Sequence, residues 1–145
     1  PKVSDGRAGM LKEMTSKAIE TLSRNNKGFV IMVEGSMIDF GAHENNIDYV
    51  INEVIDMDEA VGVALDFASK DGKTLVLVTA DHETGGLAIT GGNIPDHKVV
   101  AGFSGKDHTA AMVPVFSIGP GSEKFAGIHE NTFFKNHFIE LLKLK

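Results

Sequence analysis

The chain has 145 residues, 42% of them hydrophobic and 23% charged, a balance typical of one globular domain with its own core. Its formal net charge of −6 argues against nucleic acids and anionic membranes as partners, because both require a basic surface. The absence of cysteine excludes disulfides and thiolate metal ligands. No apolar run is long enough to span a membrane. The first residues include neither an initiating Met nor the apolar core of a signal peptide, so we expect an excised piece of a longer protein.

The first half of the chain predicts a helix, a strand, a second helix and a second strand. Apolar residues recur every three or four positions over 8–26, which indicates an amphipathic helix. The apolar run 29–33 is typical of a strand buried on both faces, as in a parallel sheet. A long apolar stripe predicts a helix over 46–69, with the acidic stretch Glu53–Glu59 on its solvated face. With a strand at 74–79, this order predicts a right-handed βαβ unit.

The second half is richer in glycine and predicts shorter elements. Short strands are expected at 87–90 and 99–103, and another buried strand begins at Val113. A final helix is expected over 133–144. The whole chain, residues 1–145, is therefore predicted to be a single α/β domain with a mostly parallel sheet flanked by helices.

Residues that bind metals follow two of the predicted strands directly. Glu34 comes after the first strand, and Asp81 and His82 come after the second. In open α/β sheets, ligands bind beyond the carboxyl ends of the strands, and parallel strands bring those ends to one edge. These three side chains could therefore meet, although they are far apart in the sequence.

Three further residues could complete a metal site. Asp39 and His43 are four positions apart, so on a helix they share one face and can bind one ion. His108 lies in a glycine-flanked loop. Together they offer three ligands and leave one position open, as in catalytic zinc sites. Glu34 alone would suit an all-oxygen magnesium site.

Each of these groups also has a simpler interpretation. A carboxylate at a strand end is usually solvated, and Asp39 with His43 could be a helix-surface pair that contributes only about 0.2–0.5 kcal/mol. For His97, His129 and His137 the simpler interpretation is preferred. Spacing alone leaves the metal hypothesis and these alternatives about equally supported.

Three segments together resemble the alkaline phosphatase family, in the order and spacing of its motifs from Gly28 to Asn136. They are VEGSMIDFGAHENN, VTADHETGG and KDHTAAMVPVFSIGPGSEKFAGIHENT. The resemblance implies that the chain is the C-terminal part of a catalytic domain with a three-layer α/β sandwich. It also implies a periplasmic or secreted homodimer that hydrolyses phosphate monoesters through a phosphoserine.

The resemblance assigns metal roles to six residues. It implies that a first Zn²⁺ is bound by Asp39, His43 and His108. A second Zn²⁺ would be bound by Asp81 and His82, and Glu34 would help to hold one Mg²⁺.

The sequence departs from the family pattern in the residues that carry the reaction. The Asp-Ser motif with the nucleophile, the Asp that bridges two metals and the phosphate-binding Arg are expected upstream and are not found here. We therefore expect the isolated chain to be inactive and to self-associate through surface exposed by truncation. The alternatives are a related enzyme acting on sulfate esters or phosphodiesters, and a non-catalytic metal-binding domain.

Overall fold

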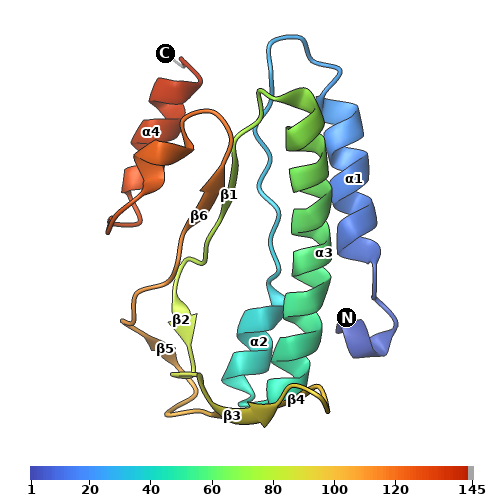
Figure 1. Ribbon diagram of the computed structural model, residues 1–145, viewed down its shortest axis with the longest axis vertical. Helices are drawn as coiled ribbons and strands as arrows, with labels where there is room; N and C mark the ends of the chain where they lie inside the picture. Colours follow the sequence, from blue (N-terminus) through green and yellow to red (C-terminus); the bar gives the residue numbers. More distant parts are fainter. Residues whose placement is uncertain (144–145) are drawn as a thin grey trace.

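The computed structural model describes residues 1–143, and a bundle of three helices forms its main core (Figure 1). A 3₁₀ turn, η1 (Val3–Asp5), precedes α1 (Met10–Leu22), and α2 (Met37–His43) and α3 (Ile47–Asp71) follow. Both α1 and α2 pack against α3. The buried apolar residues of this core come from all three helices. None of the helices in the described part of the chain is long and apolar enough to cross a membrane.

Helix α3 confirms the longest predicted helix, and local signals account for both of its ends. At its start, the Asn46 side chain accepts a hydrogen bond from the backbone N–H of Tyr49. At its end, Gly72 takes a left-handed conformation with φ of 67° and donates to the Ala68 carbonyl. Helix α1 is shorter than the predicted 8–26 at both ends. Its start is set by Gly9, which is left-handed with φ of 79° and precedes the first helical residue, and its last helical residue is Leu22.

The acidic stretch of α3 is only in part the solvated face that its composition predicts. Glu53 and Asp56 are only 3% and 5% exposed. Both carboxylates pair with the guanidinium of Arg7, where Nη1 lies 2.7 Å from Asp56 Oδ2. They also accept hydrogen bonds from the backbone N–H groups of Val3 and Gly9. The expectation holds for Asp58 and Glu59, which are exposed. It was wrong for Glu53 and Asp56 because a cation far away in the sequence folds back onto their carboxylates.

The described strands pair only as antiparallel two-stranded ladders, so the predicted parallel sheet is not observed. The pairs are β1 (Val76–Val78) with β6 (Phe116–Ile118), β2 (Glu83–Thr84) with β5 (His108–Thr109), and β3 (Ala88–Asn93) with β4 (Lys98–Gly102). The β1–β6 ladder lies between α3 and the last helix, α4 (Phe133–Leu141), which follows a 3₁₀ turn, η2 (Ser122–Phe125) (Figure 1). The end of the helix predicted over 133–144 lies partly outside the described residues.

The predicted strand 29–33 is extended but is not paired. It runs in the same direction as β1 (Figure 1), yet none of the backbone hydrogen bonds described for residues 1–143 involves it. An apolar cavity of about 140 Å³ separates the two segments, lined by Phe29, Ile31 and Val33 on one side and by Leu75–Val78 on the other. The βαβ unit was wrong in its pairing because a strand also needs a neighbouring backbone, which side-chain patterns do not specify.

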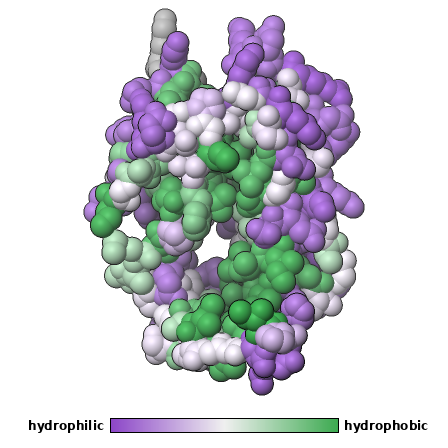
Figure 2. Space-filling view, in the orientation of Figure 1, coloured by the Kyte–Doolittle hydropathy of each residue, from purple (hydrophilic) through white to green (hydrophobic). Residues whose placement is uncertain are grey.

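The accessible surface of the molecule is larger than that of a compact monomer of the same mass. Its accessible surface is 10,123 Å², whereas a compact monomer of this mass exposes about 7,200 Å². Large hydrophobic side chains such as Met32 and Ile94 are about nine-tenths exposed. The space-filling view shows hydrophobic residues around the hollowed middle of one face (Figure 2). Much of the apolar surface thus remains available for contact with other polypeptide.

Candidate metal centre

Helix α2 positions the first two candidate ligands. It confirms the helical spacing of Asp39 and His43, whose Oδ2 and Nε2 atoms are 3.3 Å apart. The helix packs closely on α3 at Gly41, where an added Cβ would lie 3.1 Å from atoms of both Tyr49 and Val50. A glycine here therefore lets α2 approach α3 and directs its polar edge toward β2 and β5.

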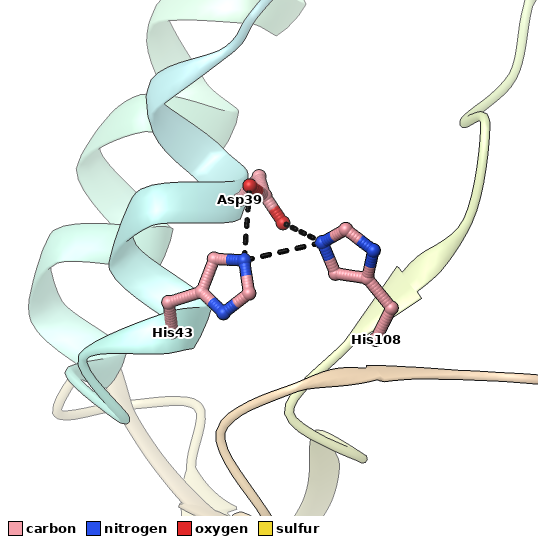
Figure 3. A group of neighbouring side chains, drawn as sticks. All are labelled: Asp39, His43 and His108. Carbon is pink, nitrogen blue, oxygen red and sulfur yellow. Dashed lines mark hydrogen bonds and ion pairs between the residues drawn. The ribbon is translucent and has the colours of Figure 1, made fainter.

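The β2–β5 ladder brings in the third candidate ligand. It pairs Thr84 with His108, whose Nε2 lies 3.2 Å from His43 Nε2 and 3.6 Å from Asp39 Oδ1. Figure 3 shows the three side chains converging from α2 and from β5. We call Asp39, His43 and His108 the Asp39 cluster. Its members are about one-third to one-half exposed, so a solute can reach them.

The dimensions of the Asp39 cluster fit one zinc ion. Ligand atoms at about 2.0–2.1 Å from a tetrahedral ion are about 3.3–3.4 Å from one another. The two Nε2 atoms are 3.2 Å apart, and each faces a different oxygen of the Asp39 carboxylate, His43 at 3.3 Å from Oδ2 and His108 at 3.6 Å from Oδ1. One ligand atom from each residue lies within 4.8 Å of the others, which is close enough for the three to share an ion. Two imidazoles and one carboxylate also form a donor set that zinc prefers, and three ligands leave one position for water or substrate.

Asp81 and His82 form a second pair, the Asp81 pair, beside the Asp39 cluster. Asp81 Oδ2 lies 3.3 Å from His82 Nε2, which is again the separation of two ligands on one ion. The His82 ring stacks on the His108 ring, with 3.5 Å between the ring centroids. The pair is therefore in contact with the Asp39 cluster, and it offers only two ligand atoms.

The structure does not bring Glu34 into either group. Its side chain is exposed, and it has no hydrogen bond or ion pair to another described residue. It follows the unpaired segment 29–33, so no ladder holds it toward β1. The convergence of Glu34 with Asp81 and His82, which rested on the predicted parallel sheet, is not observed.

Several groups that the sequence analysis overlooked hold the candidate ligands in place. The backbone carbonyl of Lys106 contacts His43 Nδ1, and the Thr84 hydroxyl contacts Asp39 and His82. Glu83 accepts hydrogen bonds from the Thr109 hydroxyl and from the backbone N–H groups of Gly86 and Leu87. The Thr109 hydroxyl bond is the main reason that the pKa of Glu83 is lowered. The sequence gives only one sign of this role: Lys106, Glu83, Thr84 and Thr109 lie within two positions of His82 or His108.

The Asp39 cluster and the Asp81 pair lie side by side in an α/β fold. This arrangement is that of a candidate metalloprotein. Its fold is that of solved alkaline phosphatases. It matches the enzyme of the Antarctic bacterium TAB5 with a TM-score of 0.91 and 44% identity, over 100% of this chain and 44% of that one. A mutant of that enzyme, solved with Mg bound, matches with a TM-score of 0.91 and 42% identity, over 100% of this chain and 44% of that one.

The amino-acid sequence leads to the same family. The alkaline phosphatase family model matches residues 4–102, which is more than half of the chain. Alkaline phosphatase 4 of Bacillus subtilis is 31% identical over 96% of this chain, and the alkaline phosphatase of Escherichia coli K12 is 38% identical over 84%. The chain belongs to the alkaline phosphatase family. It spans 45% and 29% of the lengths of these two relatives.

Proposed function

We propose that this chain supplies zinc and magnesium ligands to a metal-dependent phosphate monoester hydrolase, as part of a longer protein. The observation that carries the proposal is the convergence of the Asp39 cluster, in which one ligand atom from each of the three residues lies within 4.8 Å of the others. Family membership supports phosphate monoesters as the substrate class.

The six candidate ligands would divide among three ions. Asp39, His43 and His108 would hold the first zinc, and Asp81 with His82 would supply two ligands for the second. Glu34 would help to hold magnesium once a neighbouring backbone orders segment 29–33, and the magnesium bound in the TAB5 mutant supports such a site in the family. When bound, paired metal ions stabilise the attacking and leaving oxygens of a phosphoryl transfer.

The protein side chains have more specific tasks in this proposal. His43 and His82 would bind the ions through their Nε2 atoms, because the Nδ1 atoms of both rings already have partners. The exposure of the Asp39 cluster leaves room for a phosphate group to approach. The nucleophile is expected outside this chain, since its sequence contains no Asp-Ser dipeptide.

We predict that the isolated chain does not hydrolyse a chromogenic phosphate monoester when zinc and magnesium are added. The second zinc would have two of its four ligands, and no nucleophile is assigned within these residues. The measurement compares the unmodified chain with His108→Ala. Turnover by the unmodified chain that is lost in His108→Ala would show that a nucleophile lies within these residues and would contradict the prediction.

The substrate class is tested on the longer protein that contains this chain. We expect its kcat/KM for a phosphate monoester to exceed its kcat/KM for a phosphodiester and for a sulfate ester. A preference for either of the other substrates would instead support the related enzyme of the same superfamily. Zinc binding without any turnover by the longer protein would support a non-catalytic metal-binding domain.

We also propose that the isolated chain self-associates, with a second copy covering segment 29–33 and the free edge of β1. Segment 29–33 and β1 are both extended, and they flank an apolar cavity. We expect sedimentation velocity to show dimers or larger species whose fraction grows with concentration. Met32→Lys should reduce that fraction, because Met32 is 89% exposed on the unpaired segment. A monomer over the whole concentration range would exclude this self-association.

We further propose that the longer protein works in the periplasm or outside the cell. The resemblance to bacterial alkaline phosphatases supports this location, and a chain without cysteine does not depend on disulfide formation there. Fractionation of cells that express the longer protein would test it, and retention of the activity in the cytoplasm would contradict it.

A further inference from the structure

Thr84 lies between the two groups of candidate ligands and touches both. It is 8% exposed and belongs to β2, directly opposite His108 in the β2–β5 ladder. Its hydroxyl Oγ1 donates a hydrogen bond to Oδ1 of Asp39, on α2. The same oxygen lies 3.2 Å from Nδ1 of His82. A single hydroxyl therefore connects the Asp39 cluster with the Asp81 pair.

The hydrogen bonds of Thr84 favour one tautomer of His82. An ionised carboxylate only accepts hydrogen bonds, so the one hydrogen of the Thr84 hydroxyl goes to Asp39. Toward His82 the hydroxyl oxygen can then only accept, so this contact favours the Nδ1–H tautomer, the one in which Nε2 can bind an ion beside Asp81. A neutral imidazole has one N–H, which leaves Nε2 with a free lone pair. That Nε2 lies 3.3 Å from Asp81 Oδ2, where a shared ion would bind.

His43 has the same arrangement with a different partner. Its Nδ1 contacts the backbone carbonyl of Lys106, which can only accept, so this contact also favours the Nδ1–H tautomer and leaves Nε2 to an ion shared with Asp39 Oδ2. Its Nε2 faces His108. The tautomer of His43 thus depends on the backbone, whereas the tautomer of His82 depends on a side chain that can be replaced.

The Thr84 hydroxyl also orients Asp39. It donates to Oδ1, the oxygen that faces His108 at 3.6 Å, and leaves Oδ2, 3.3 Å from His43 Nε2, free of this hydrogen bond. Partners of this kind restrict the rotation of a ligand before the metal arrives, and their loss typically weakens metal binding about 10–100-fold.

We propose that Thr84 is a positioning residue that prepares both groups for metal at once, by orienting Asp39 and by fixing His82 as its Nδ1–H tautomer. This inference rests on the proposed function, since it takes Asp39 and His82 to be ligands. It predicts that one hydroxyl affects two separate metal sites.

The test compares Thr84→Val, which keeps the branched shape without the hydroxyl, with Thr84→Ser, which keeps the hydroxyl. Thr84→Ala is a second hydroxyl-free variant in case Val does not fit, and amide spectra establish that each variant folds. Nitrogen-15 spectra of the imidazoles, recorded without metal at about pH 8.5, about two units above the ordinary pKa of a histidine side chain, report each tautomer. His82→Gln identifies the His82 signals, and His43 serves as an internal control.

We expect His82 to be the Nδ1–H form in the unmodified chain and in Thr84→Ser, and to lose that preference in Thr84→Val and Thr84→Ala. The signals of His43 should not change. The dissociation constant for zinc should rise about 10–100-fold in the two hydroxyl-free variants and stay near the original value in Thr84→Ser.

An unchanged His82 tautomer in Thr84→Val and Thr84→Ala would overturn the inference, as would unchanged zinc affinity in both. Failure of the proposed function has a different signature. In that case the unmodified chain would not bind zinc at all, while the tautomer spectra, which need no metal, would still decide whether Thr84 sets the state of His82.

Discussion

Replacing Arg7 with Met should destabilise the fold by about 3–5 kcal/mol, because it would leave two carboxylates buried without a cation. Glu53 and Asp56 have side chains that are 2% and 4% exposed, and the Arg7 guanidinium bridges them with its own side chain 10% exposed. Their remaining hydrogen bonds, from the N–H groups of Val3 and Gly9, carry no full positive charge. Such a loss is a large part of the roughly 5–15 kcal/mol that stabilises an ordinary domain.

Arg24→Ala is the matched control for this prediction. Arg24 pairs with Glu20 at 2.8 Å, but both side chains are more than half exposed and screened by water, so its loss should leave the unfolding midpoint almost unchanged. Urea unfolding of the two variants, read by circular dichroism, gives the comparison. Equal midpoints for Arg7→Met and Arg24→Ala would show that the buried carboxylates are neutralised in another way. If Arg7→Met does not fold, Arg7→Lys keeps the charge and should retain part of the stability.

Zinc should raise the melting temperature of the unmodified chain by about 5–10 °C when its free concentration is about 100 times the dissociation constant. A ligand that binds the folded state alone adds about 2.7 kcal/mol under this condition. Zinc would also neutralise the carboxylates gathered at the Asp39 cluster and the Asp81 pair, so a chelator should reverse the increase. Differential scanning calorimetry, with and without zinc, measures the effect.

His108→Ala should remove most of this increase, because it deletes one of the three candidate ligands that gather in the Asp39 cluster. His97→Asn is the control. His97 lies outside the cluster in a turn with φ of 51°, a left-handed conformation that Asn tolerates. The control should keep the full increase. An equal increase in His108→Ala, or none in the unmodified chain, would contradict a zinc site at these residues.

Local features of the sequence were sufficient to predict where the long helices lie. The periodicity of α3, its Asn46 cap and its Gly72 terminus act within a few residues of each other, and all are visible along the chain. The same holds for Asp39 and His43, which become neighbours as soon as α2 forms. The residue types of the candidate site and the resemblance to alkaline phosphatases also required the sequence alone, and the comparisons confirm the family.

Only the tertiary structure decided which strands pair and which distant side chains meet. Segment 29–33 and β1 both have the apolar pattern of buried strands, but hydrogen bonding requires a neighbouring backbone, and β1 pairs with β6 instead. The burial of Glu53 depended on Arg7, which is 46 positions away. His108 reaches His43 only through the β2–β5 ladder, and the same ladder places the Thr84 hydroxyl between Asp39 and His82. Contacts of this kind depend on the relative positions of distant segments, so no local pattern in the sequence encodes them.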